Sequence, residues 1–318
     1  MGKIVAAMAS SHAFTLVEPE RWDELRERNR AGYTRRYGVE PPVHPKISEE
    51  SLESIRVRHE GIRTGLEELR EKLSEKKPDA LILIGDDQDE NFKEDNLPQI
   101  AIYLGKEVFT TERGEGGYRR GARYPCHSDL ARRLLDGFVE RGFDVSFSKS
   151  FPNDELLSHA HGPILQRVMP EADIPIVLLF VNAIHMPAIS PGRCYHLGQA
   201  MREIIEGQAG PDRVAVYASG GLSHFTAGYP WCDYHGPYTY GSISEEFDRH
   251  ALEFMSRGEG EKLSGLSTHD LLDHGDIEMR SWITLLGAVG KTPATVLAYE
   301  PFYRAIMGMA VAYWELEN

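Results

Sequence analysis

Polar residues that could do chemistry stand at the ends of four apolar, strand-like runs. They are His12 after "KIVAAMAS", the acidic turn "GDDQ" from Gly85 to Gln88 after "ALILI", Asn182 after "IPIVLLFV", and His224 after "RVAVYASGGLS". Because ligands of open α/β sheets bind beyond the carboxyl ends of the strands, these side chains are expected to converge. Each one alone is most simply a solvated turn or a structural histidine, but several at one sheet edge favour a site. Carboxylate, amide and imidazole groups together suit a metal ion, and imidazole can also carry a proton near neutral pH.

Gly220 and Gly221 stand between a predicted strand and His224. A glycine pair in this place permits a tight turn and a close approach of the backbone to a ligand. A turn that needs a positive φ would explain the pair equally well. The position of the glycines beside His224 is what favours a site.

Strands alternating with amphipathic helices must position these residues. The predicted strands are 3–9, 80–85, 100–105, 144–148, 174–181 and 213–219, and the predicted helices are 48–76, 128–142, 192–207, 243–257, 278–289 and 301–315. This alternation predicts an α/β fold with a mostly parallel central sheet flanked by helices. We expect one domain over residues 1–318, in which 15–47, with mixed charge and the prolines Pro41, Pro42 and Pro45, form an insertion or a lid.

Composition excludes several classes of function. A formal net charge of −14 disfavours nucleic acid and acidic membrane surfaces, because both reward a basic patch. Cys126, Cys194 and Cys232 lie far apart, so neither a disulfide framework nor a cysteine zinc site is indicated. No run has the length of a signal peptide core or a membrane span. A soluble, cytoplasmic protein is expected.

Four motifs carry a resemblance to a known family. They are "SH" at residues 11–12, "SHAHG" at 158–162, "GGLSH" at 220–224 and "IEMRSWITLLGA" at 277–288. Together they resemble the class III extradiol ring-cleaving dioxygenases of the protocatechuate 4,5-dioxygenase β-subunit type, over most of the chain outside residues 15–58. The resemblance implies that His12 and Glu278 are iron ligands, that His224 is the acid/base beside the substrate, and that His161 is a second active-site histidine.

The sequence departs from the family at the acidic turn. There the family has a triplet whose histidine completes a site of two histidines and one carboxylate. Here the triplet is Asp86, Asp87 and Gln88, which puts Gln88 in the place of the histidine and Asp87 in the place of the family's aspartate. We therefore predict Gln88 and Asp87 as metal ligands, with Fe(II) as the metal and Mn(II) or Zn(II) as alternatives. Ala160 replaces the aspartate that precedes the family's active-site histidine.

The resemblance implies an activity and its partners. A dioxygenase of this kind inserts both atoms of O2 into a catechol or a related hydroxylated aromatic and opens the ring. Its partners would be a small aromatic substrate and O2, and the family commonly forms homo-oligomers. We predict that Ser223 and Asn182 contact the substrate, and that the ring-rich stretch 229–240 either walls the pocket or merely packs. The alternatives are a metal-dependent hydrolase or lyase on the same fold, and a noncatalytic homologue that has lost its metal.

Overall fold

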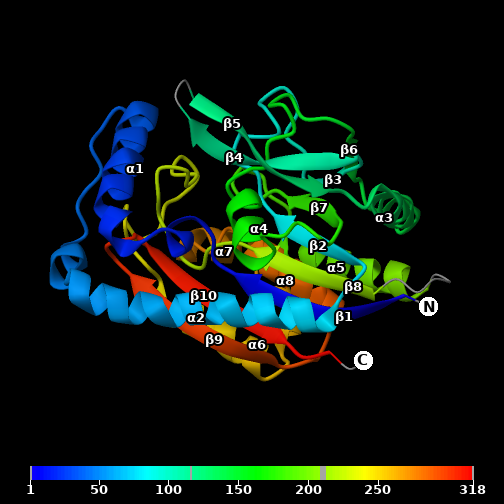
Figure 1. Cartoon of the computed structure of the whole chain (residues 1–318). Helices are drawn as coiled ribbons and strands as arrows, with labels where there is room; N and C mark the ends of the chain where they lie inside the picture. The colour runs from blue at the N-terminus through cyan, green and yellow to red at the C-terminus, as the bar shows by residue number, and fades with distance from the viewer. Residues whose placement is uncertain (1, 115–116, 208–212, 317–318) are drawn as a thin grey trace.

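A mixed sheet of eight strands runs through the centre of the computed structural model, which describes residues 2–114, 117–207 and 213–316 (Figure 1). From edge to edge its strands are β6 (Ser146–Ser148), β3 (Ile100–Tyr103), β7 (Ile176–Val181), β2 (Ala80–Gly85), β8 (Arg213–Ser219), β1 (Lys3–Ser10), β10 (Met307–Trp314) and β9 (Ala294–Phe302). The central run from β7 to β1 is parallel, whereas β3 is antiparallel to β7, and β10 to both β1 and β9. The predicted α/β class is confirmed, and all six predicted strands lie in this sheet.

Helices bury both faces of the sheet. One face is covered by α2 (Leu52–Lys76) and α4 (Gly162–Val168), and the other by α3 (Ser128–Glu140), α5 (Pro191–Glu206), α6 (Glu245–Ser256) and α8 (Met279–Val289). Strand β2 is apolar throughout because both of its faces are buried. Leu81 and Leu83 face α2, while Ile82 and Ile84 face the helices on the other side of the sheet. In the described ranges, no helix has both the length and the apolar character to cross a bilayer.

The remaining elements are short or lie outside the main sheet. The hairpin of β4 (Glu107–Gly114) and β5 (Gly117–Pro125), which was not predicted, forms a separate two-stranded sheet. The short helices are η1 (Ala13–Leu16), η2 (Pro19–Arg21), η3 (Pro45–Glu49), η4 (Gly260–Gly265) and α7 (Thr268–His274), and one longer helix, α1 (Trp22–Tyr37), stands apart from the sheet.

The predicted helix over 301–315 is wrong, because this segment contains the end of β9 and all of β10. Every residue of β10 is buried. A run buried on both faces has no polar side to set a period of two, so its apolar pattern does not distinguish a strand from a helix. This difference bears on the site, because β10 pairs with β1, the strand that leads to His12. A strand and not a helix therefore lies beside β1.

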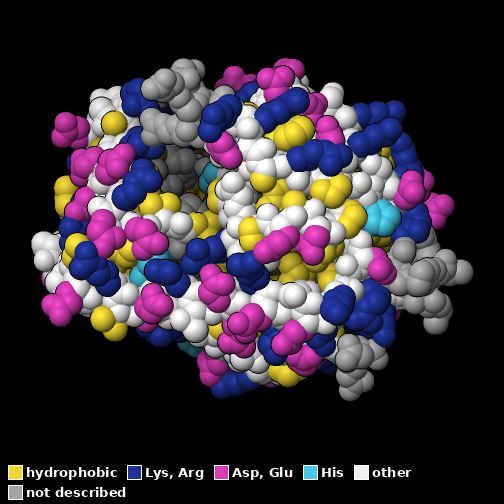
Figure 2. Space-filling model, in the orientation of Figure 1, with side chains coloured by type: hydrophobic (Ala, Val, Ile, Leu, Met, Phe, Trp, Pro, Cys, Tyr) yellow, Lys and Arg dark blue, Asp and Glu magenta, His cyan; other side chains and the backbone are white. Residues whose placement is uncertain are grey.

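Helix α1, within the predicted insertion 15–47, packs on the loop that follows His224. Tyr37 Oη donates to the carbonyl of Tyr229 at 2.7 Å, and Asn29 Oδ1 accepts from the amide of Ala227 at 3.0 Å and from Tyr240 Oη at 2.8 Å. The face in Figure 2 is hollowed between α1 and the β4–β5 hairpin. On that face Lys and Arg side chains are interspersed with Asp and Glu rather than gathered into a basic patch. A lid function of segment 15–47 stays a prediction.

Helices α5 and α8 cross at two glycines, which brings their backbones into contact. A Cβ on Gly287 would lie 1.9 Å from the carbonyl oxygen of Tyr195, and a Cβ on Gly198 would lie 1.8 Å from that of Thr284. Backbone atoms cannot swing away as a side chain can, so only glycine fits at both positions. This crossing fixes α8, and with it Glu278, which directly precedes the helix.

Gly287→Ala is therefore expected to destabilise the protein by about 3 kcal/mol or more, at the upper end of overpacking costs. Gly61→Ala on α2 is the control, because its Cβ would meet nothing within 4 Å, and we expect it to be neutral or to stabilise by up to about 1 kcal/mol. Urea unfolding of both variants measures the effect. Equal stability of the two variants would contradict the close crossing.

Candidate active site

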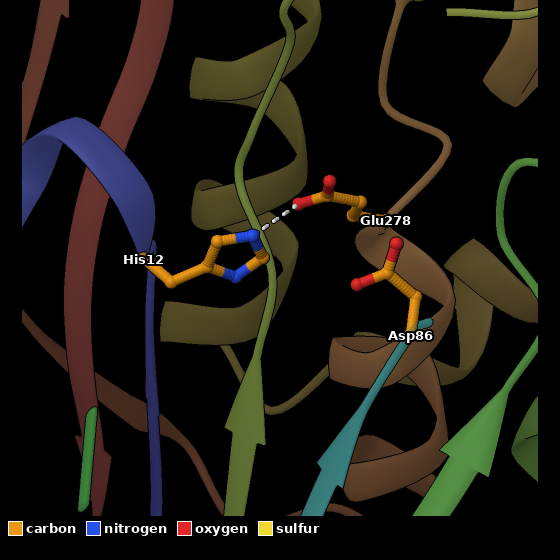
Figure 3. A group of neighbouring side chains, drawn as sticks. All are labelled: His12, Asp86 and Glu278. Atoms are coloured by element: carbon orange, nitrogen blue, oxygen red, sulfur yellow. Dashed lines mark ion pairs between the residues drawn. The ribbon is translucent and has the colours of Figure 1, made fainter. Parts of the chain in front are cut away.

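Three buried side chains from distant parts of the chain point toward one another (Figure 3). His12 follows β1, Asp86 follows β2, and Glu278 precedes α8. One ligand atom of each lies within 4.8 Å of those of the other two. Because β1 and β2 flank β8 in the sheet, their carboxyl ends bring His12 and Asp86 to the same edge. A histidine and two carboxylates at this spacing form a group that could hold a metal ion.

The hydrogen bonds around His12 place its ring proton on Nδ1, so that Nε2 can act as an acceptor. The hydroxyl of Ser219 donates to the carbonyl of Ala160, so it must accept from Nδ1 of His12, which lies 3.2 Å away. The other nitrogen, Nε2, then carries a lone pair and faces Oε2 of Glu278 at 3.6 Å. Burial lowers the pKa of His12 to about 4, which keeps the ring neutral at pH 7. A neutral imidazole fixed through its second nitrogen is the form that binds metals.

Glu278 is held as a buried carboxylate by donors on the neighbouring turn. The amide of Gly221 donates to Oε2 at 2.5 Å, and Nε2 of His224 lies 3.3 Å from Oε1. Burial raises the pKa of this carboxyl, but His12, His224 and the Gly221 amide outweigh it and hold the pKa well below its usual range. A Cβ on Gly220 would lie 2.7 Å from the carbonyl oxygen of Glu278, and neither glycine has a positive φ. Close approach therefore explains the glycine pair.

His224 is oriented by two acceptors. Its Nδ1 lies 2.6 Å from the carbonyl oxygen of Leu222, and its Nε2 faces Glu278. Burial lowers the pKa of His224, but Glu278 and the Leu222 carbonyl outweigh it and raise the pKa to about 9. The ring is therefore cationic at neutral pH and has a proton to give at Nε2.

The structure separates the two predicted ligands of the acidic turn. The amide nitrogen of Gln88 lies 3.2 Å from Oδ2 of Asp86 and 3.1 Å from Oε1 of Glu278, so Gln88 joins the group. The carboxylate of Asp87 instead accepts the backbone amides of residues 90, 91 and 92 at 3.2, 2.8 and 3.1 Å. Asp87 thus shapes its own loop, and Asp86, which was not predicted as a ligand, takes the place beside His12.

Ser223 and Asn182, the two residues predicted to contact the substrate, form hydrogen bonds with other parts of the protein. The hydroxyl of Ser223 donates to buried Asp248 at 2.9 Å. The side chain of Asn182 bonds the backbone of His185 with both ends, donating to its carbonyl at 2.6 Å and accepting from its amide at 2.9 Å. Both side chains brace local turns, and neither is brought into the group around His12.

His161 is also set back from the group. It is buried, with Nδ1 2.7 Å from Oγ of Ser158, and its Nε2 lies under β2, where a Cβ on Gly85 would be 2.8 Å away. The histidine of "SHAHG" that lies against the site is His159, whose ring meets that of His12 edge-on at 5.0 Å between centroids. His159 was not predicted, because both histidines stand in the same motif and residue type alone does not distinguish them.

Glu90, two residues after the acidic turn, forms an ion pair with His159. Its Oε2 lies 2.7 Å from Nδ1 of His159, and its carboxylate also accepts the backbone amide of His159 at 3.1 Å. Burial lowers the pKa of His159, but Glu90 outweighs it and raises the pKa to about 9. A second cationic imidazole therefore stands beside His12 at neutral pH.

The His159–Glu90 pair predicts a pH dependence of stability. A histidine pKa raised by folding contributes stability that is complete below about pH 6.5 and is lost as the pH rises through about 9. Because the His159 side chain is 36% exposed, solvent reduces the effect. The midpoint of thermal unfolding of the metal-free protein should fall between pH 6.5 and 9.5 by more in wild type than in Glu90→Gln. His224 titrates over the same range in both proteins, so parallel curves would contradict the prediction.

Comparison with known proteins agrees with the fold and shows the family. The family model described as the catalytic LigB subunit of aromatic ring-opening dioxygenase matches residues 11–312, which include every member of the group. The chain belongs to the LigB family. The resemblance found in the sequence motifs is thereby confirmed.

Two curated relatives of the LigB-family chain are dioxygenases. Gallate dioxygenase of Pseudomonas putida is 27% identical over 195 residues, which cover 60% of this chain and 53% of that enzyme, so the chain spans about half of its length. The 2,3-dihydroxyphenylpropionate/2,3-dihydroxicinnamic acid 1,2-dioxygenase of Burkholderia vietnamiensis is 23% identical over 275 residues, 74% of this chain and 83% of that one. The crystal structure of an uncharacterized Escherichia coli K12 protein shares the fold, with a TM-score of 0.53, 15% identity, and 98% and 99% of the two chains covered.

Proposed function

We propose that this LigB-family protein is an extradiol-type dioxygenase that inserts both atoms of O2 into a catechol or a related hydroxylated aromatic and opens the ring. The observation that carries the proposal is the convergence of His12, Glu278 and His224 in one buried group at the edge of the sheet. It combines two metal-binding side chains with an imidazole that can move a proton.

The residues fit a divalent metal ion. Nε2 of His12 and Oε2 of Glu278 are both acceptors, yet they face each other at 3.6 Å. Oδ1 of Asp86 is buried and has no hydrogen-bond partner among the described residues. Lone pairs that face one another in a buried place are stabilised by a cation between them. His12 and Glu278 would hold the ion, Fe(II) with Mn(II) or Zn(II) as alternatives. When bound, Fe(II) or Mn(II) would supply the redox chemistry, whereas Zn(II) is redox-inert.

His224 would be the acid/base. Its pKa is raised chiefly by Glu278, so any loss of negative charge on Glu278 lowers the pKa toward neutrality. Near neutrality an imidazole can take a proton from a substrate hydroxyl and return it later in the reaction. His159, kept cationic by Glu90, would offer positive charge to a substrate oxygen beside His12.

Oxygen uptake tests the proposal. The protein is purified without oxygen, analysed for metal, loaded with Fe(II) and given catechols such as gallate and 2,3-dihydroxyphenylpropionate. Consumption of one O2 per substrate, with both atoms of ¹⁸O2 in a ring-opened product, supports it. Conversion of substrate without O2 would favour the hydrolase or lyase, and a wild-type protein that binds neither metal nor substrate would favour the noncatalytic alternative. Homo-oligomerisation and a cytoplasmic location remain predictions from the sequence.

A further inference from the structure

We propose that Asp86, and not Gln88 or Asp87, is the third protein ligand of the metal centre, which makes this a site of one histidine and two carboxylates for a hard divalent ion such as Mn(II) or Fe(II). The assignment rests on the proposed function in one respect, that the group binds a metal. It differs from the ligand set inferred from the sequence, because the carboxylate comes from a different residue of the acidic turn.

Asp86 has the properties of a ligand without its ion. Its side chain is fully buried, Oδ2 accepts only from Gln88 at 3.2 Å, and Oδ1 has no partner among the described residues. No Lys or Arg side chain in the part of the chain that the structure describes forms an ion pair with it. The carboxylate points toward His12 and Glu278 (Figure 3). A buried carboxylate in such surroundings is costly unless a cation or a proton meets it.

Gln88 faces the group as a donor. An amide nitrogen has two hydrogens, and its two neighbours, Asp86 Oδ2 and Glu278 Oε1, are both acceptors. Its oxygen lies on the other side, against Gly228, where an added Cβ would be 3.0 Å from Oε1. Turning the amide to present its oxygen would place a third acceptor beside two carboxylates and leave both without their donor. Gln88 is therefore a positioning residue that braces the two carboxylates.

The spacing and chemistry of the three ligand atoms suit a hard ion. Bonds of about 2.0–2.2 Å to one metal place neighbouring ligand atoms roughly 3–4 Å apart. The three atoms here lie within 4.8 Å of one another, so a small closing movement would suffice. Replacing an imidazole by a carboxylate shifts preference away from Zn(II) and toward Mn(II) and Fe(II), because hard ions favour oxygen.

Binding of Mn(II) to the metal-free full chain tests the assignment without any assay of activity. Isothermal titration without oxygen, supported by the Mn(II) EPR signal, compares wild type with Asp86→Asn, Gln88→Ala and Asp89→Asn. We expect Asp86→Asn to weaken binding by about 100-fold or more, and Gln88→Ala by about 10-fold, because loss of an outer-shell partner typically costs 10–100-fold. Asp89→Asn should bind as wild type does.

Asp89 is a matched control. It directly follows the acidic turn, pairs with His185 at 3.2 Å, and has a positive φ of 62°, which asparagine tolerates. Asp86→Asn is expected to fold, because asparagine has the same shape and its side-chain oxygen can still accept from Gln88. Thermal unfolding of each metal-free variant checks that the variant folds. The Mn(II) affinity of Gln88→Ala tests the assignment independently of Asp86→Asn.

Each outcome decides between the ligands. Strong loss in Asp86→Asn with a smaller loss in Gln88→Ala supports the assignment. Wild-type affinity in Asp86→Asn, or a larger loss in Gln88→Ala than in Asp86→Asn, overturns it, as does a wild type that binds no Mn(II). If Mn(II) binds through Asp86 but the Fe(II)-loaded protein takes up no O2 with any catechol, the metal site stands and the proposed dioxygenase function fails.

Discussion

His224→Ala is expected to lower the turnover of the Fe(II)-loaded protein by about 10²–10⁴-fold, the usual contribution of a general acid/base, with little loss of bound metal. His224 touches Glu278 through Nε2 at 3.3 Å but is not one of the three side chains that converge on the candidate metal position. Its loss removes a proton carrier and leaves His12, Asp86 and Glu278 in place.

Two measurements separate this role from a structural one. Metal content is determined beside kcat for His224→Ala and for the control His196→Ala, an exposed histidine on α5. The pH profile of kcat should lose its limb near neutrality only in the His224 variant. Full activity of His224→Ala on a substrate that the wild type cleaves would show that the proton moves by another route.

Glu278→Ala is expected to abolish both metal binding and activity and to destabilise the metal-free protein by about 3–5 kcal/mol. The carboxylate is buried, and its removal leaves Nε2 of His224 and the amide of Gly221 without their acceptor. Glu278→Gln keeps an acceptor for Gly221 and should cost less stability, yet it should still lose the ion, because a neutral amide is a weak ligand.

Urea unfolding and Mn(II) titration of the two variants measure these effects. Glu253→Ala on α6 is the control, since its exposed pair with Arg257 is worth at most about 1 kcal/mol. If Glu278→Ala bound one equivalent of metal, Glu278 would not be a metal ligand, and the burial of its carboxylate would have no explanation.

The general position of the site could be predicted because strand ends are visible in a sequence. Buried strands appear as continuous apolar runs, and parallel strands send their following residues to one edge. His12, Gln88, Glu278 and His224 were identified in this way or through the family motifs, and the structure brings these four together.

The details that the structure places differently from the prediction depend on local backbone geometry. Asp86 and Asp87 are adjacent acids, and the path of the turn after Gly85 decides which one points inward and which one caps the loop. The same holds for His159 and His161, which stand two residues apart in an irregular segment that ends where α4 begins. Residue types alone do not fix such directions, since both members of each pair have the same chemistry.

Strand β1 has a consequence for how the protein is made. His12 follows a strand that lies between β8 and β10, and the amide of Ala310 donates to the hydroxyl of Ser11 across 299 residues of chain. At roughly 5–20 residues per second, a ribosome needs about 15–60 s to span that distance. Until β10 has been synthesised, the apolar strand β1 lacks one of the two strands that it pairs with. Chaperones protect nascent chains in such a state. The proposed ligands after β1, after β2 and before α8 can meet only once Glu278 has been synthesised, so we expect the ion to come from the pool that surrounds the folding chain, where metal availability decides which ion enters.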